Sequence, residues 1–487
     1  MAKFIMALDQ GTTSSRSILF DHNGEIVAVS QQEFTQYFPK SGWVEHDAEE
    51  IWQSQLKTME AVMKKAGAEV SDLAGIGITN QRETVVVWER STGKPICNAI
   101  VWQDRRTADV CQQMKSEEAV VSAKTGLRID PYFSATKVAW ILDHVDGARN
   151  RAEQGELCFG TIDSWLVWNL TDGEKHVTDA SNASRTLLFN IHEGDWDDDL
   201  LALFNVPKSM LPEVVDSSGE IGRWQDVAIA GVAGDQQAAL FGQACYEPGR
   251  AKNTYGTGCF MLTHTGDQVV DSENDLLSTV AWRIRGKLEY ALEGGVFIAG
   301  ALFQWLRDGL GLVNKVQEID QLASECTHSD GVVLVPAFAG LGAPHWDPNA
   351  RGVLVGISRG TEKKHICRAA IDAVCFQSLE LLECMEKDTG LDISELRVDG
   401  GAVVSDVLMQ SQADIIQRDI VRPEIIETTA FGAAALAGLG VGFWESRDEL
   451  AHTWREEKRY SPQIDAGELI EKRKLWDKAV ERSKAWA

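Results

Sequence analysis

Short runs of branched and aromatic apolar residues, separated by polar or glycine-containing turns, predict strands in the N-terminal part of the chain. Residues 5–20 contain two such runs, around Ala7 and Ile18, and we expect them to form a hairpin. A turn at residues 22–24 then precedes a third run at Glu25–Glu33. Three further strands are expected at Leu73–Thr79, Thr84–Glu89 and Asn98–Trp102.

The first helical pattern follows the third strand. Asp47 and Glu50 form the sequence signature of a capping box, and apolar residues recur at helical spacing as far as Lys65, with Gly67 beyond the end. The positions expected to be buried are Ile51, Trp52, Leu56, Met59, Val62 and Met63. Three strands, a helix and then further strands and helices are the order of a ribonuclease-H-like α/β domain.

The second half of the chain repeats this order. Residues 251–264 again consist of an apolar run, a turn rich in glycine and threonine, and another apolar run. Two more strands, at Leu277–Ile284 and Lys287–Leu292, and two helices, at Val296–Leu310 and Lys364–Lys387, are expected after it. A weak repeat of this kind indicates two similar domains. We place their boundary at the proline and glycine of residues 246–249, which gives domains 1–246 and 247–487.

Length and charge narrow the classes of function. A chain of 487 residues is too long for one hydrophobic core and suits two domains with a cleft between them. The net charge of −26 argues against a nucleic-acid partner, because such partners select positively charged surfaces. No apolar run is long enough to cross a membrane and no export signal precedes Asp9, so we expect a cytoplasmic protein. Nine scattered cysteines indicate reduced thiols.

The turn of the predicted hairpin has the composition of a phosphate site. Gly11 would let backbone N–H groups come close to a polyphosphate, and Asp9 would hold a hydrated Mg²⁺ that faces those phosphates. Hydroxyl donors and a positive charge come from Thr12, Thr13, Ser14 and Arg16. The alternative is a polar hairpin turn with an ordinary aspartate, and this segment alone does not decide between the two.

A second candidate lies in Val227–Leu240, where an apolar strand ends in Gly234 and Asp235 opens a helix. A carboxylate at the carboxyl end of a strand in an open α/β sheet points to the ligand cleft. Asp235 is therefore predicted to be a general base that accepts a proton from an attacking hydroxyl. The alternative role is a helix N-cap, which is common for aspartate at such a junction.

A third segment, Leu396–Gln410, predicts a strand, a turn that contains Gly400 and Gly401, and a helix. The two glycines leave room for a flat or phosphorylated group against bare backbone at a helix start, which suits a nucleotide. Turns of this kind are common in α/β proteins, so this interpretation depends on the other segments.

A fourth set of residues suits a small polyhydroxy compound. Arg82, Glu83 and Tyr132 offer hydrogen-bond donors and acceptors beside Asp235, and Trp102 would cover the carbons. A buried site that bonds several hydroxyls rejects analogues that lack them. The alternative is a surface ion pair between Arg82 and Glu83, with a tryptophan that only packs.

Together these segments resemble the FGGY carbohydrate kinases, and among them the kinases that act on glycerol, over essentially the whole chain. The resemblance rests on residues 7–16, 42–47, 78–84, 234–243 and 252–260, and on two longer stretches, Tyr132–His144 and Gly352–Asp372, that are similar to the family signatures. It implies an α/β protein with two ribonuclease-H-like domains of the actin and hexokinase type. ATP, Mg²⁺ and glycerol would bind in the cleft, and the chain would form a homodimer or homotetramer.

The resemblance also implies roles for individual residues. Asp235 would be the catalytic base, and together with Asp9 it would lie at the Mg²⁺. Glycerol would be held by Arg82, Glu83, Trp102, Tyr132, Asp235, Gln236 and Phe260. ATP would contact Thr12, Thr13, Ser14 and Arg16 through its phosphates, and Thr257, Gly300, Gln304, Gly401 and Ser405 elsewhere.

The sequence departs from the family pattern at two places. Ser405 stands where the family usually has asparagine, so that position keeps one hydroxyl and loses an amide. The segment Asp216–Asp226 is shorter than a glycine-rich loop that some bacterial relatives use for control by a sugar bisphosphate. We therefore do not expect that control here.

Two other functions remain open at this point. Kinases of the same family that act on a pentulose typically have a Met-His-Gly-like run where this chain has Gln81, Arg82 and Glu83, so the local residues favour glycerol over a pentulose or gluconate. A non-catalytic actin-like module, such as a chaperone ATPase or a sugar sensor, would give no purpose to the combination of Arg82 and Glu83 with Tyr132 and Gln236.

Overall fold

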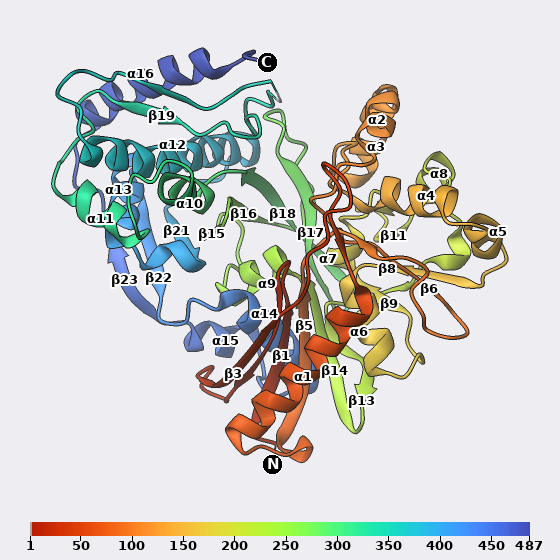
Figure 1. The fold of residues 1–487 in the computed structure, drawn as a ribbon. Coiled ribbons are helices and arrows are strands. Elements are labelled where there is room, and N and C mark those ends of the chain that lie inside the picture. Colours follow the sequence, from red (N-terminus) through yellow and green to blue (C-terminus); the bar gives the residue numbers. More distant parts are fainter. Residues whose placement is uncertain (1, 348) are drawn as a thin grey trace.

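A single large sheet connects the two halves of the chain in this computed structural model, which describes residues 2–347 and 349–487. Its 13 strands follow the order β23-β22-β21-β15-β16-β18-β17-β13-β14-β5-β1-β2-β3 among those residues (Figure 1). The first half supplies β1 (Phe4–Gln10), β2 (Ser14–Phe20), β3 (Ile26–Glu33), β5 (Leu73–Asn80), β13 (Ser218–Trp224) and β14 (Val227–Gly234). The second half supplies β15 (Ala251–Tyr255), β16 (Cys259–Gly266), β17 (Leu277–Ile284), β18 (Lys287–Val296), β21 (Glu395–Asp399), β22 (Asp419–Pro423) and β23 (Glu456–Tyr460).

The strand predictions at the N-terminus are confirmed. β1, β2 and β3 form an antiparallel meander, and β5 and β14 continue the sheet parallel to β1. Ile5, Leu8 and Ile18 are completely buried, as expected for strands with helices on both faces. The strands expected around residues 84–102 are shorter than predicted, at β6 (Val86–Glu89) and β7 (Ala99–Ile100).

The helix predicted after Asp47 is α1 (Ala48–Ala66), and its ends are confirmed. The Asp47 side chain accepts hydrogen bonds from the first backbone N–H groups, and Gly67 ends the helix in the left-handed conformation. The second half of the capping-box prediction, in which Glu50 bonds back to the start of the helix, is wrong. The Glu50 carboxylate instead accepts hydrogen bonds from the backbone N–H and the hydroxyl of Thr35. A tertiary partner has therefore replaced the local one.

The face of α1 that meets the sheet is partly polar. Ser54 lies 2.9 Å from Ser15 and Thr58 lies 2.8 Å from Ser17, measured between hydroxyl oxygens. Because these buried polar side chains occupy the contact, three residues expected in the core are only half-buried; they are Trp52, Leu56 and Met63.

Further helices flank the sheet on both sides. The longest, α12 (Lys363–Thr389), confirms the helix predicted there, and α10 (Gly300–Asp308) begins later than expected because β18 extends to Val296. Figure 1 shows α2 (Ala108–Gln113), α3 (Glu118–Thr125), α4 (Ser134–His144) and α5 (Ala148–Glu153) at the right, and α11 (Gln317–Ser324), α12 and α16 (Ala466–Ser483) at the left. No helix within residues 2–347 and 349–487 is both long and apolar enough to span a bilayer.

Two helices from different halves pack against each other. α9 (Asp235–Gly242) and α14 (Thr428–Val441) are in contact near the centre of the molecule (Figure 1). α14 comes from the second half but packs on β1, β5 and β14 of the first. The approach is so close that a Cβ on Gly432 would overlap the carbonyl oxygen of Ala238. Only glycine permits this contact, so the two halves are joined tightly at this point.

Candidate active site

Asp9 and Asp235 lie on the same edge of the sheet. The register aligns Asp9 with Thr79 on β5, and Thr79 with Ala233 on β14. Asp9 and Asp235 therefore lie at the carboxyl ends of the two strands that flank β5, with Asp235 two residues beyond the aligned Ala233. That edge is where open α/β sheets bind ligands.

Asp235 is the first residue of α9, and the N-cap position belongs to Gly234, so capping is not its role. Its carboxylate lies 3.1 Å from Arg82 Nε and accepts a 2.7 Å hydrogen bond from the backbone N–H of Gln236. About a third of the side chain is exposed, at 35%. The surrounding protein nevertheless withdraws the carboxylate from bulk water, which raises the pKa of Asp235 to about 6, although Arg82 opposes this rise.

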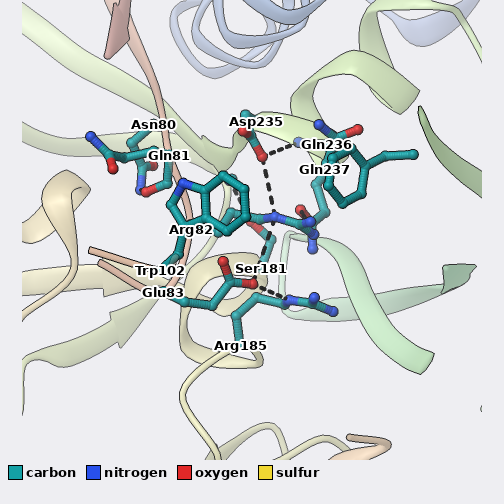
Figure 2. A network of polar contacts seen from close by, with 12 residues as sticks. Asn80, Gln81, Arg82, Glu83, Trp102, Ser181, Arg185, Asp235, Gln236 and Gln237 are labelled. Atoms are coloured by element: carbon teal, nitrogen blue, oxygen red, sulfur yellow. Dashed lines mark hydrogen bonds and ion pairs between the residues drawn. The ribbon is translucent and has the colours of Figure 1, made fainter. Parts of the chain in front are cut away.

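Arg82 and Glu83 are buried, with 2% of each side chain exposed, so the alternative of a surface ion pair is wrong. Arg82 is held by Glu293 through two contacts, of 2.6 Å to Oε2 and 3.0 Å to Oε1. Arg185 bonds to the same Glu293 carboxylate at 3.0 Å and to Glu83 at 2.8 Å, and Figure 2 shows the contact with Glu83. Burial alone would raise the pKa of Glu293, but Arg185 and Arg82 lower it to about 2.

The backbone of Glu83 adopts a conformation that L-residues rarely take. Its φ angle is +61°, in the left-handed region, and such a residue costs about 1–3 kcal/mol. The ion pair with Arg185 and the turn closed by the Thr84 N–H to the Arg82 carbonyl hold it there. Strained residues of this kind concentrate at functional sites, where the surrounding structure holds the side chain in an orientation that regular strand geometry does not allow.

Two aromatic residues enclose this charged group. The Trp102 and Tyr132 rings meet edge to face with centroids 5.7 Å apart. Trp102 Nε1 donates a 3.0 Å hydrogen bond to Thr12 Oγ1, so one side chain connects the predicted glycerol and phosphate regions. Desolvation raises the pKa of Tyr132, so this phenol stays neutral beside Arg82.

The remaining predicted glycerol residues are joined by a lysine from the second half. Lys252 Nζ donates hydrogen bonds to Gln236 Oε1 on α9, to Thr254 Oγ1 at 2.8 Å and to the Phe260 carbonyl at 3.3 Å. Burial lowers the pKa of Lys252 to about 8, and Asp399 and Asp235 oppose that shift. The structure therefore brings Gln236 and Phe260 to the same cluster as Asp235.

The turn between β1 and β2 is polar, and some of its polar groups already form hydrogen bonds within the protein. The Gly11 N–H, expected to face phosphate, donates to the Ser14 carbonyl at 2.9 Å. Ser14 Oγ is buried and accepts a hydrogen bond from Gln31, whereas Thr13 is exposed. The hydroxyl groups of Thr12 and Thr13, more than the Gly11 amide, are thus the donors available at this turn.

Arg16 lies directly beside Asp9. The two side chains form an ion pair, and Arg16 Nη1 makes a second one of 2.8 Å with Glu427, which precedes α14. Asp9 raises the pKa of Arg16. The guanidinium therefore stands between a carboxylate of the first half and one of the second.

The predicted nucleotide residues lie on the second half. Thr257 is exposed in the turn between β15 and β16, and the Gly300 N–H at the start of α10 donates to the Gly256 carbonyl at 3.0 Å. β15 pairs with β21, so Gly401 follows a strand end beside that turn. Gln304 is exposed on α10. Ser405 caps α13 (Asp406–Ile416), and its hydroxyl also donates to Asp320 at 2.8 Å, so this hydroxyl is already engaged.

Sequence reasoning missed the charged residues that organise the site. Arg185, Glu293 and Lys252 were not predicted, although all three are buried against predicted residues. One signal was present, because Glu293 interrupts an apolar run in β18 and a charge in a buried strand needs a partner.

The sequence carries both domains of one family. The N-terminal domain of the FGGY family of carbohydrate kinases matches residues 4–242, and the C-terminal domain matches residues 251–441. This chain belongs to the FGGY family of carbohydrate kinases. The resemblance inferred from the sequence motifs is thereby confirmed.

Curated FGGY relatives match over nearly their whole length. The glycerol kinase of Deinococcus radiodurans is 59% identical over 491 residues, which cover 99% of this chain and 98% of the relative. The glycerol kinase of Paraburkholderia phytofirmans is 56% identical over 493 residues, 100% of this chain and 99% of the relative.

Solved FGGY structures have the same two-domain α/β fold. The glycerol kinase of Plasmodium falciparum with ADP superposes with a TM-score of 0.93 at 36% identity, over 99% of this chain and 98% of that one. A xylulose kinase from Lactobacillus acidophilus superposes with a TM-score of 0.88 at 24% identity, over 99% of this chain and 97% of that one. At this identity the match supports the fold alone. The predicted fold class is confirmed.

Proposed function

We infer that this chain transfers the γ-phosphoryl group of ATP to glycerol, giving glycerol 3-phosphate and ADP. The observation that carries this conclusion is the full-length identity of 55–59% to curated glycerol kinases. This identity extends over both domains of the family. The arrangement of Arg82, Glu83 and Asp235 at one sheet edge supports it independently of any relative.

We propose that glycerol lies between Asp235 and the two aromatic rings. Its hydroxyls would bond to Arg82, Glu83, Tyr132, Asp235 and Gln236, while Trp102 and Phe260 would cover the carbon chain. The support is that Arg82, Glu83 and Gln236 are buried donors and acceptors, which a ligand without hydroxyls would leave unpaired.

Asp235 is the proposed general base. With a pKa of about 6 it is ionised at neutral pH and accepts the proton of a terminal hydroxyl. The hydroxyl oxygen then forms a bond to the γ-phosphorus as the bond from that phosphorus to the bridging oxygen breaks, and ADP leaves. Arg82 holds the carboxylate from the side, so Asp235 is oriented before the substrate binds.

The phosphates would bind at the turn between β1 and β2. We propose contacts from Thr12, Thr13, Ser14 and Arg16, whose hydroxyls and charge suit a transferring phosphoryl group. Mg²⁺ would neutralise charge on the phosphates, with Asp9 and Asp235 as its nearest carboxylates. Mg²⁺ at a nucleotide typically takes one or two protein carboxylates and its other ligands from phosphate and water.

We propose that the two halves divide the substrates. Residues 1–246 would hold glycerol and the transferring phosphate, and residues 247–487 would hold the rest of the nucleotide. The proposed nucleotide contacts are Thr257, Gly300, Gln304, Gly401 and Ser405. Support comes from the paired turns at the ends of β15 and β21, which present glycine backbone on one edge.

A substrate panel tests this function. ADP release is measured with ATP and Mg²⁺ alone, and then with glycerol, xylulose or gluconate added. We expect glycerol to raise ADP release far more than the other two compounds. Faster turnover on xylulose or gluconate would reassign the substrate, and ADP release that no polyol stimulates would contradict the kinase function.

A further inference from the structure

Lys252 is a buried lysine that forms no direct ion pair with a carboxylate among the described residues. The carboxylates of Asp399 and Asp235 act on its charge without touching Nζ. The three hydrogens of the ammonium instead go to three neutral oxygens, those of Gln236, Thr254 and Phe260. Burying an ammonium without an ion pair is unfavourable, so this arrangement calls for a functional explanation.

The ammonium determines which way the Gln236 amide faces. An ammonium only donates hydrogen bonds, so the atom that faces it must be the carbonyl oxygen Oε1 and not the NH₂ group. Gln236 Nε2 is then left as a donor, and in the described part of the chain no protein acceptor bonds to it. Gln236 follows Asp235 directly, and Figure 2 shows the two side chains at the same site.

The same ammonium also fixes the neighbouring strand. Phe260 lies on β16, where it pairs with Thr254 of β15, and Lys252 bonds to both. One side chain of the second half thus fixes a polar group on α9 and the backbone of an aromatic residue on β16. Both of these residues are proposed glycerol contacts, whereas Lys252 itself has no hydrogen left to offer the substrate.

We propose that Lys252 is a positioning residue for polyol selectivity, which sets the Gln236 amide so that Nε2 donates to a glycerol hydroxyl. The inference rests on the proposed function, because it names what orients one glycerol contact. Loss of the ammonium leaves the amide free to turn, so that Nε2 is no longer held as a donor toward the glycerol hydroxyl. The effect should therefore appear in glycerol binding and not in ATP binding.

The test is a double-mutant cycle between Lys252→Met and Gln236→Leu, read as KM and kcat for both substrates. Lys252→Met should raise the glycerol KM by about tenfold or more, the loss expected for one hydrogen bond to a neutral group, and leave the ATP KM within about threefold. In the Gln236→Leu background the same substitution should change the glycerol KM by less than about threefold, because the group it positions is gone.

A second variant keeps the proposal testable if Lys252→Met does not fold. Gln236→Glu retains an acceptor for Lys252 but has no NH₂ group, so it should raise the glycerol KM as Lys252→Met does. An unchanged glycerol KM in Gln236→Glu, or equal effects of Lys252→Met in both backgrounds, would overturn the proposal. Wild-type protein without glycerol-dependent turnover would instead overturn the proposed function, and the two failures are thereby distinguishable.

Discussion

Arg82 Nε lies 3.1 Å from Asp235 Oδ1, while the other edge of the same guanidinium is bound by Glu293. Asp235 and Arg82 belong to the first half of the chain, and Glu293 belongs to β18 of the second. The candidate base is thus oriented by a residue that the opposite half holds in place. Catalytic competence should depend on this contact between the halves.

Glu293→Gln should lower kcat/KM for glycerol by about 10- to 100-fold, because one charged partner of Arg82 and Arg185 is lost. Glu289→Gln is the matched control. Glu289 lies on the same strand but pairs with Arg447 at 3.1 Å, away from the cluster, and its loss should change kcat/KM by less than about threefold. Steady-state kinetics of both variants check this, and equal losses would contradict the role of Glu293.

The pH dependence of the reaction should follow Asp235. Its pKa is raised to about 6, and only the ionised form accepts a proton. The value of kcat/KM should therefore be constant above about pH 7 and fall about tenfold for each pH unit below 6. A profile of kcat/KM between pH 4.5 and 8.5 measures this, and an acid limb that begins near pH 4 would contradict the perturbed carboxyl.

Gly432→Ala should destabilise the joint between α9 and α14. The added Cβ would overlap the Ala238 carbonyl, so the helices must separate, at an expected cost of about 1–3 kcal/mol. Gly360→Ala is the control, since its Cβ would meet only Ser358 Oγ at 3.7 Å. Denaturant unfolding of both variants gives the free energies, and similar values for the two would refute the close helix contact.

Asp163→Asn should change how stability depends on pH. Burial, with a further contribution from Asp179, raises the pKa of Asp163 to about 7. A carboxyl whose pKa is raised in the folded state makes the protein less stable as pH rises from the unfolded pKa of about 4 to the folded pKa. The free energy of unfolding falls by about 1.4 kcal/mol per pH unit in that range.

The asparagine does not ionise. The free energy of unfolding of Asp163→Asn should therefore rise relative to that of wild type by about 2 kcal/mol between pH 5 and 7, and the difference should then level off. Thermal unfolding of both proteins across this range provides the measurement. A difference that stays constant with pH would show that Asp163 does not titrate as described.

The elements that local sequence determines were predicted well. The apolar runs predicted β1, β2 and β14, because the length of a run and the pattern of apolar residues within it are properties of the segment itself. Asp47 was recognised as an N-cap for the same reason, since its partners are the next backbone N–H groups. Glu50 was assigned wrongly because Thr35, distant in sequence, competes for its carboxylate.

The charged cluster was predictable only in part. Arg82, Glu83 and Asp235 lie at strand ends, and a strand end is a position that sequence reveals. Glu293 and Arg82 are 211 residues apart, and only the order of strands in the sheet brings them together. The sheet also joins the two halves through the pairing of Ser218 with Ile284, which neither half predicts alone.

The central claim is that Asp235 takes the proton from bound glycerol. The most direct measurement compares wild type and Asp235→Asn in ADP release at saturating glycerol and ATP, with glycerol binding to both proteins measured by calorimetry. We predict that turnover falls by about 10²–10⁴-fold while glycerol binding stays measurable. Turnover in Asp235→Asn within a few fold of wild type would contradict the account.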